Sequence, residues 1–317
     1  MLWRSIQMVC VPFSLKHMRY PNFLLFLAIL FLFSCQPADQ TASFDIQGHR
    51  GCRGYYPENS LIGFQKAIEM GVNTLEMDVV ITHDKQVLVS HDPWISKLIC
   101  LDSSGNAIAD SLATYWNIYQ MDYDEVAQFQ CGSFPHPNFP EQQQFPYSKP
   151  LLGSVVAMAE DLVAKEGLQP IQYNIEIKSA LEGDEIFHPK PEEFVGLVLA
   201  EIKKAKIEDR TIIQSFDPRV LMVINDHYPH IKTAYLTDNQ LGFQHNLSRL
   251  DFKPTIFSPH KMFVTQAMID YFHKENIQVI PWTVNDTSTM KTLIHLGVDG
   301  IITDYPDRLV DLVNRHQ

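Results

Sequence analysis

Short apolar segments alternate with amphipathic segments from residue 44 onward, and this alternation limits the possible folds more than any other feature. The apolar segments have the length of β-strands: 44–48, 74–80, 87–89, 171–177, 211–214, 233–236, 255–258, 278–282 and 300–302. The others repeat apolar residues at helical spacing: 61–70, 151–166, 192–204, 219–226, 265–275, 287–296 and 308–314. Seven or eight strand–helix units without a glycine-rich dinucleotide loop predict a (β/α)8 TIM barrel rather than an open doubly wound sheet.

Residues 92–149 interrupt this alternation. The segment is rich in Pro, Ser, Asn and Gln, and four prolines lie close together at positions 135, 137, 140 and 146. An irregular segment of this length is unusual inside a compact domain and is usually functional where it occurs. We therefore expect a loop-rich insertion, at about 92–149, that covers one end of the barrel.

The first 35 residues are predicted to be a targeting signal. An apolar run at 23–33 is too short to span a bilayer comfortably and fits the core of a signal peptide. Ser34-Cys35 resembles the cleavage box of bacterial lipoproteins, in which the cysteine is acylated and becomes the new N-terminus. The predicted organisation is a signal peptide (1–35), a tether (36–43) and a barrel domain (44–317), in a protein exported and lipid-anchored to a bacterial membrane. Met18 is an alternative start, and a buried helix ending at Cys35 is the alternative interpretation of the leader.

Charge and cysteine usage exclude some kinds of site. With 25 basic and 37 acidic residues the formal charge is −12, which argues against nucleic acid, because phosphates require basic partners. An acidic chain is compatible with binding a divalent metal. Cys100 and Cys131 flank one irregular region and could pair in an exported protein, but spacing leaves this open. The sequence has no CxxC or Cys/His zinc spacing, so a thiolate metal site is not expected.

Carboxylates recur at two predicted strands. Glu76 and Asp78 are two residues apart, so on a strand both side chains point to the same side. Glu176 and Lys178 repeat this spacing on a later strand. Oxygen donors that converge at the mouth of a barrel suit Mg²⁺ or Ca²⁺ better than Zn²⁺. The alternative is a buried salt-bridge network that includes Lys178 or Arg50.

Two histidines, His49 and His91, each end a predicted strand. Histidine is the side chain best suited to acid–base work near neutral pH. A single histidine at a strand end is more often structural, but two that flank a carboxylate pair favour catalysis. Arg50 offers a planar fork that suits phosphate. Glu58-Asn59 could instead be a helix cap, and this alternative is stronger for Asn59.

The sequence predicts the roles of several other polar and aromatic residues less specifically. Phe216 and Trp282 follow or end strands and could line a substrate wall or belong to the core. Asp304 lies in the closing segment 297–306 and is interpreted as closing the barrel instead of reacting. Arg53 lies in a variable loop, and the sequence does not say whether it reaches a substrate.

Six motifs, taken in order, resemble glycerophosphodiester phosphodiesterases. They are His49-Arg50-Gly51, Pro57-Glu58-Asn59, Glu76-Met77-Asp78, His91-Asp92, Glu176-Ile177-Lys178 and the segment Gly297–Pro306. The resemblance runs from about residue 46 to 310. Each motif alone is weak, whereas the ordered set is highly specific.

The resemblance implies a (β/α)8 barrel that hydrolyses glycerophosphodiesters to sn-glycerol 3-phosphate and an alcohol. It implies one divalent cation, Ca²⁺ or Mg²⁺, held by Glu76, Asp78 and Glu176, and an acid–base pair formed by His49 and His91. The positions that contact substrate or the metal site are Arg50, Glu58 and Lys178, beside the wall residues Phe216 and Trp282.

The expected partners are the small-molecule substrate and, through the lipid anchor only, a membrane. Three rival functions remain. A phospholipase-type lyase would stop at a cyclic product and act on lipids. A non-catalytic binding lipoprotein would have lost the reactive positions, which are all filled. A barrel glycosidase would give no role to the paired histidines.

Overall fold

The computed structural model describes residues 44–112 and 114–316. The predicted signal peptide and tether therefore lie outside the described residues. Within the described part of the chain, no helix combines the length and the apolar character needed to cross a bilayer.

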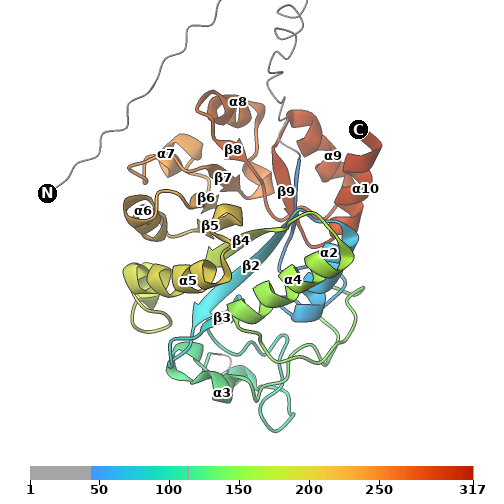
Figure 1. The fold of residues 1–317 in the computed structure, drawn as a ribbon, viewed down its shortest axis with the longest axis vertical. Helices are drawn as coiled ribbons and strands as arrows, with labels where there is room; N and C mark the ends of the chain where they lie inside the picture. Colours follow the sequence, from blue (N-terminus) through green and yellow to red (C-terminus); the bar gives the residue numbers. More distant parts are fainter. Residues whose placement is uncertain (1–43, 113, 317) are drawn as a thin grey trace, which may run out of the picture. The chain divides into compact units, whose positions relative to one another are not determined.

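Eight parallel strands form a nearly closed barrel with helices around its outside, which confirms the predicted fold class (Figure 1). The strands are β1 (Asp45–Gly48), β2 (Thr74–Ile81), β4 (Gln172–Ile177), β5 (Thr211–Ser215), β6 (Lys232–Thr237), β7 (Ile256–Pro259), β8 (Gln278–Val279) and β9 (Gly300–Thr303). Their order around the sheet is β8-β7-β6-β5-β4-β2-β1-β9. Between β9 and β8, the Asp299 N–H donates to the carbonyl of Val279 at 3.0 Å, so the two ends of the sheet meet.

The helices follow the strands in the expected alternation. They are α2 (Leu61–Met70), α4 (Leu152–Glu166), α5 (Pro191–Ala205), α6 (Pro218–His227), α7 (Phe243–Leu247), α8 (Gln266–Lys274), α9 (Thr287–Leu296) and α10 (Pro306–His316). Glycines end α2, α4 and α9 in the left-handed conformation, which lets the chain leave the helix without a Cβ clash: Gly71, Gly167 and Gly297.

Two elements differ from the prediction. The strand expected at 278–282 is assigned only at Gln278–Val279, because Pro281 has no N–H to continue a regular ladder. Trp282 nevertheless still donates its N–H to the carbonyl of Pro259 in β7 at 3.1 Å. Helix α7 was not predicted, because its five residues are too few to establish a helical period.

Strand residues alternate between the two sides of the barrel wall. An apolar cluster packs on the inner side. It includes the strand residues Ile212, Ala234, Ile256 and Ile302, together with Ile280 and Trp282 just beyond β8. The other strand faces pack against the helices in the main core, as Leu75, Met77 and Val79 of β2 do. The intervening residues of β2, Glu76 and Asp78, therefore point into the barrel.

The insertion follows β3 (Val87–Val89), which pairs antiparallel with the end of β2. It contains helix α3 (Tyr123–Val126) and two short 3-10 helices, Asp110–Leu112 and Ile118–Gln120 (Figure 1). Buried side chains give it an apolar cluster of its own, and Cys100 and Cys131 form a disulfide within that cluster. Two more 3-10 helices follow the barrel strands β4 and β7, at Leu181–Gly183 and Lys261–Phe263, and one precedes β5, at Glu208–Arg210.

Candidate active site

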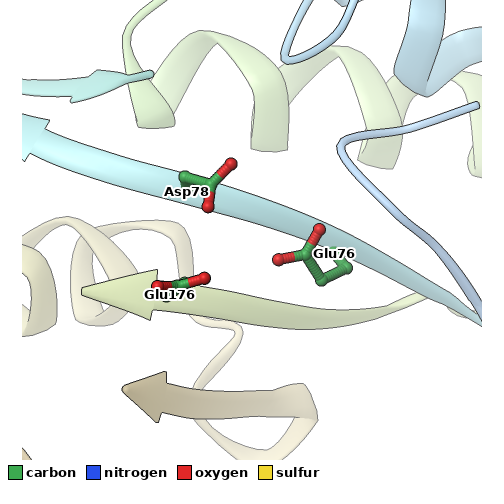
Figure 2. A group of neighbouring side chains, drawn as sticks. All are labelled: Glu76, Asp78 and Glu176. Carbon is green, nitrogen blue, oxygen red and sulfur yellow. The ribbon is translucent and has the colours of Figure 1, made fainter. Parts of the chain in front are cut away.

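Three carboxylates from neighbouring strands converge inside the barrel. Glu76 and Asp78 lie on β2, and the strand register places Glu176 of β4 opposite Asp78. One oxygen from each residue lies within 4.8 Å of one from each of the others, and all three side chains are buried (Figure 2). The structure thus brings together the three residues predicted to bind a metal.

The charges around this cluster fit a divalent cation. Burial, followed by repulsion from Asp78 and Glu176, raises the pKa of Glu76 well above its usual value. Oδ1 of Asp78 is buried without a hydrogen-bond partner among the described residues. The network contains five buried carboxylates and three cationic side chains: Glu58, Glu76, Asp78, Glu176 and Asp304 against Arg50, Arg53 and Lys178. A divalent cation, which prefers such oxygen ligands, would balance the excess.

The carboxylates also form salt bridges with Lys178 and Arg50, as expected for the alternative interpretation of a buried salt-bridge network. Lys178 Nζ lies 2.8 Å from Glu176 Oε1 and 3.7 Å from Asp78 Oδ1. Arg50 Nε lies 3.1 Å from Asp78 Oδ2, and Arg50 Nη1 donates to Glu58 Oε1 at 3.0 Å. The two interpretations are compatible, because the cationic groups neutralise only part of the negative charge.

The loop after β1 holds an unusual backbone conformation beside the carboxylates. Arg50 and Asn59 both have positive φ angles, 50° and 52°, which are uncommon for non-glycine residues. The Arg50 N–H donates to Glu76 Oε2 at 2.8 Å, and Asn59 Nδ2 donates to Asp78 Oδ2 at 2.9 Å. Ser60, not Asn59, caps helix α2. Asn59 therefore orients a carboxylate, and its interpretation as a cap was wrong.

Both histidines are held in the same way. His49 Nδ1 lies 2.7 Å from Asp304 Oδ1, and His91 Nδ1 lies 2.7 Å from Asp92 Oδ1. A carboxylate at Nδ1 favours the proton on that nitrogen and leaves Nε2 available as a proton acceptor. His49 Nε2 lies 4.0 Å from Glu76 Oε2, so it faces the carboxylate cluster.

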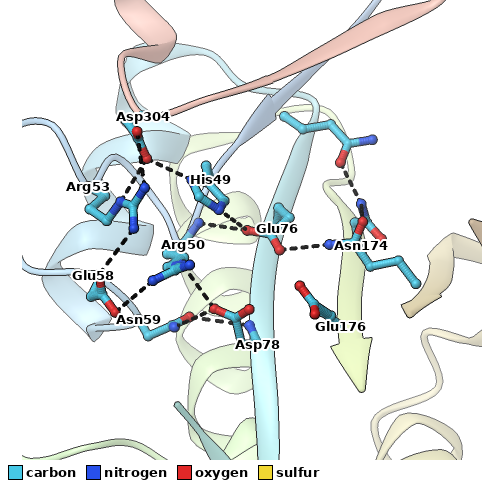
Figure 3. A network of polar contacts seen from close by, with 12 residues as sticks. His49, Arg50, Arg53, Glu58, Asn59, Glu76, Asp78, Asn174, Glu176 and Asp304 are labelled. Carbon is cyan, nitrogen blue, oxygen red and sulfur yellow. Dashed lines mark hydrogen bonds and ion pairs between the residues drawn. The ribbon is translucent and has the colours of Figure 1, made fainter. Parts of the chain in front are cut away.

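Asp304 lies at the site beside His49, whereas the sequence predicted only that it closes the barrel. Besides bonding His49, it accepts a hydrogen bond from Arg53 Nε at 2.9 Å (Figure 3). It also accepts a hydrogen bond from Asn285 Nδ2 at 2.7 Å. Arg53 also reaches Glu58 at 3.5 Å. Asp304 directly follows β9, so its place at a strand end was the available signal. Arg53 gave no comparable signal.

Burial and neighbouring charge set the protonation of these groups. Burial lowers the pKa of His49 to about 4, although Asp304 opposes the shift. Burial alone would raise the pKa of Glu58, but Arg50 and Arg53 outweigh it and lower that pKa to about 2. For Asp304, His49 and Arg53 likewise overcome burial and hold its carboxyl pKa below the usual value. Glu58 and Asp304 are therefore anionic at neutral pH.

A cavity of about 250 Å³ opens over the cluster. Its lining residues are His49, Arg50, Arg53, Glu76, His91, Glu176, Lys178, Gln214, Phe216, Leu236, Trp282, Thr283 and Ile302. Phe216 and Trp282 form an edge-to-face pair, with ring centroids 5.3 Å apart, and so make an aromatic wall. Glu58 is absent from the lining and lies behind Arg50 and Arg53, where it fixes both guanidinium groups.

Comparison with known proteins identifies the family. A family described as the glycerophosphoryl diester phosphodiesterase family matches residues 49–308. The glycerophosphodiester phosphodiesterase of Bacillus altitudinis is 28% identical, covering 84% of this chain and 97% of the relative. A solved structure from Silicibacter pomeroyi is 28% identical with a TM-score of 0.75, covering 86% of this chain and 94% of that one.

An Oleispira antarctica phosphodiesterase, solved in complex with its product sn-glycerol-3-phosphate, has a TM-score of 0.66 and covers 85% of this chain and 96% of that one. At 21% identity it supports the fold alone. The match over most of the chain, together with the barrel and its carboxylate and histidine cluster, shows that this chain belongs to the glycerophosphoryl diester phosphodiesterase family.

Proposed function

We propose that this protein hydrolyses glycerophosphodiesters to sn-glycerol 3-phosphate and an alcohol, with His49 and His91 as the acid–base pair. The observation that carries the proposal is the cavity itself. Two histidines, each held by an aspartate at Nδ1, line it together with two of the three clustered carboxylates, two arginines and a lysine. Family membership and the names of relatives such as the Bacillus altitudinis enzyme support the same reaction.

The positive side chains of the cavity match a phosphodiester anion. Arg50, Arg53 and Lys178 line the cavity, and each is fixed by a carboxylate. Donors fixed in this way can stabilise the charge that builds on the phosphoryl oxygens in the transition state without reorganising. A Mg²⁺ or Ca²⁺ ion held by Glu76, Asp78 and Glu176 would supply further charge neutralisation at the same oxygens.

The two histidines can divide the proton transfers. One Nε2 accepts the proton of the attacking hydroxyl, and the other histidine protonates the leaving alkoxide as its P–O bond breaks. The nucleophile in this proposal is the glycerol 2-hydroxyl, which forms a cyclic phosphate that water then opens. A 2-deoxy substrate should therefore show negligible turnover, and hydrolysis at a comparable rate would contradict the cyclic route.

Release of glycerol 3-phosphate tests the proposed activity. Purified protein should release it from glycerophosphocholine, glycerophosphoethanolamine or glycerophosphoglycerol. Activity should disappear after chelation, with metal content checked by elemental analysis, and return with Mg²⁺ or Ca²⁺. Full activity in protein shown to be metal-free would contradict the metal site. Failure to release glycerol 3-phosphate from all three substrates in metal-loaded protein would contradict the function.

We also propose that the protein is exported and acylated at Cys35. The Cys100–Cys131 disulfide supports this, because such bonds persist mainly in oxidising compartments. Cells fed a radiolabelled fatty acid should label the wild-type protein and not a Cys35→Ser variant. Equal labelling of the two proteins would contradict the anchor.

A further inference from the structure

A second cavity of about 320 Å³ adjoins the catalytic cavity. The two share three lining residues, Glu176, Lys178 and Phe216, so they adjoin along these side chains. The remaining lining residues of the second cavity are Pro93, Trp94, Ser179, Ala180, Glu182, Gly183, Phe187 and His188. A phosphodiester bound over the carboxylates therefore has room for one substituent in the second cavity, which we call the side groove.

Two loops from different parts of the chain build the side groove. Pro93 and Trp94 begin the insertion, and residues 179–188 follow β4. Asn117 Nδ2, in the insertion, donates to the carbonyl of Ile186 at 2.7 Å. The rings of Trp94 and Phe187 meet edge to face, with centroids 5.7 Å apart. The insertion and the β4 loop thus close on one another and form a continuous wall.

The β4 loop is held in a fixed shape. His188 is buried, and its Nε2 accepts the Ala180 N–H at 3.0 Å while its Nδ1 donates to the carbonyl of Pro189 at 2.9 Å. Arg219 of α6 ties the loop to the barrel, with Nη1 donating to Asp184 Oδ2 at 2.7 Å. The side groove is therefore largely formed before any ligand binds, which is the usual state of a binding site.

The walls of the side groove are mainly hydrocarbon and aromatic. Pro93, Trp94, Phe187 and Phe216 supply them. Of the charged residues, Glu176 and Lys178 pair with each other at 2.8 Å, and Glu182 is exposed. Leu181 and Ile186, in the same loop, are 67% and 52% exposed, so the apolar surface continues outward from the groove.

These walls fit an apolar substituent better than a quaternary ammonium group. Aromatic rings can bind such a cation, but Lys178 Nζ already lies 6.0 Å from the Phe216 centroid and adds positive charge to the shared wall. Apolar groups gain from leaving water roughly in proportion to their area. An alkyl or acyl chain would cover the rings and continue along Leu181 and Ile186.

We propose that the side groove binds the alcohol portion of a glycerophosphodiester in which that alcohol carries an alkyl or acyl chain. The proposal rests on the proposed hydrolase function. Trp94 and Phe187 become specificity-determining residues, and the insertion contributes one wall of the site. The glycerophosphate half would occupy the catalytic cavity, and the chain would leave through the side groove towards Leu181 and Ile186.

A series of glycerophosphoalcohols tests this assignment. We expect kcat/KM to rise from the methyl through the butyl to the octyl ester, by roughly fourfold per methylene while the groove is being filled. Glycerophosphocholine should fall below the octyl ester. Substrates are kept below their aggregation concentration, so that the comparison reports on single molecules.

Two variants test whether the alkyl chain of the substrate lies in the side groove. Trp94→Ala and Phe187→Ala should each lower the ratio of octyl to methyl kcat/KM by roughly 10-fold or more, because each removes apolar wall. The matched control is Met262→Ala, which truncates a side chain that is 78% exposed in another strand-end loop and should preserve the ratio. Each variant is compared with itself on the methyl ester, so loss of folded protein cancels.

The outcomes distinguish the proposed hydrolase function from the proposed role of the side groove. Equal turnover of methyl and octyl esters would contradict the chain-binding groove while upholding the hydrolase. A preference for the choline ester over the octyl ester would also contradict it and assign the groove to a cation. An unchanged ratio of octyl to methyl kcat/KM in both variants would place the alkyl chain outside the side groove. No turnover of any ester would contradict the hydrolase function and the groove together.

Discussion

At the residue scale, the same local arrangement occurs at both histidines. His49 and His91 come from different strand ends, yet each has an aspartate oxygen 2.7 Å from Nδ1. A histidine held in this way keeps one tautomer and one ring orientation, both of which acid–base catalysis requires. In the proposed mechanism, Asp304 would therefore position His49, in addition to being part of the segment that closes the barrel.

Replacing Asp304 tests this role. Asp304→Asn keeps the size of the side chain but removes the anionic acceptor, so we expect kcat to fall by roughly 100-fold, within the range that acid–base catalysis contributes. KM should change little. Because the carboxylate raises the pKa of His49, its loss should also move the limb of the pH–rate profile that reports His49 to lower pH.

The control for this variant is Asp299→Asn. Asp299 also bonds a histidine, His273, but it lies away from the cavity. The Asp299→Asn substitution should leave kcat and the pH–rate profile close to those of the wild type. If Asp304→Asn loses activity only in proportion to lost folded protein, with an unmoved profile, the positioning role is wrong.

Strand-end position was enough to predict much of the cavity. Glu76 and Asp78 follow the two-residue period of one strand, so their common direction could be predicted from sequence alone. Glu176 joins them because β4 pairs with β2 in the barrel. The pairing of His49 with Asp304 could not be predicted, because 255 residues separate them and sequence spacing does not say which carboxylate faces which histidine. Arg53 reaches the site through the irregular turn after β1, where no period applies.

At the element scale, the insertion is a folded unit with its own core. Its cluster includes Val80 and Leu88 of the barrel hairpin together with Ile95, Ile118 and Phe129. Composition predicted an irregular segment, and this is largely what is seen. Its short helices and its apolar cluster were not predictable, because elements of three or four residues carry no measurable period.

The disulfide should stabilise this unit. Cys100 and Cys131 are 31 residues apart, and closing a loop of that size contributes about 2–4 kcal/mol by restricting the unfolded chain. In a Cys100→Ser/Cys131→Ser variant, limited proteolysis should cut the insertion earlier than the barrel. Urea unfolding should show the corresponding loss of stability.

Reduction supplies the control for this variant. Dithiothreitol should make the wild type as sensitive to protease as the double variant and should not affect the variant further. Equal protease resistance of the oxidised wild type and the variant would contradict a stabilising role for the bond.

At the scale of the whole molecule, the proposed metal site should link stability to metal binding through the carboxylate cluster. Its negative charges repel one another in the absence of a cation, which opposes folding. A cation that binds only the folded state should add about 2.7 kcal/mol at a concentration 100 times its Kd. We therefore expect the thermal midpoint to rise with Mg²⁺ or Ca²⁺.

Glu176→Gln should distinguish the effect of charge repulsion on stability from the effect of metal binding. The substitution removes a charge that repels Glu76 but also the partner of Lys178, so we expect a small net change in the stability of the metal-free protein. It should abolish most of the metal-dependent rise in melting temperature. Glu192→Gln, an exposed change on α5, should keep the full rise. A full metal-dependent rise in Glu176→Gln would remove Glu176 from the proposed ligands.

The barrel assembles a site from parts that are remote in the sequence. Residues 49–92 bring both histidines and two carboxylates, while Glu176, Lys178 and Asp304 come from later strand ends. The proposed site therefore depends on the whole closed fold and not on one motif.

Product analysis by ³¹P NMR tests the assignment of the two histidines, with glycerophosphocholine as substrate and Mg²⁺ or Ca²⁺ present. Wild-type protein should convert the phosphodiester signal to sn-glycerol 3-phosphate, while folded His49→Ala and His91→Ala variants should each leave it essentially unchanged. A cyclic phosphate as the final product would instead indicate a lyase. Near-wild-type conversion by either variant would contradict the assignment of the two histidines.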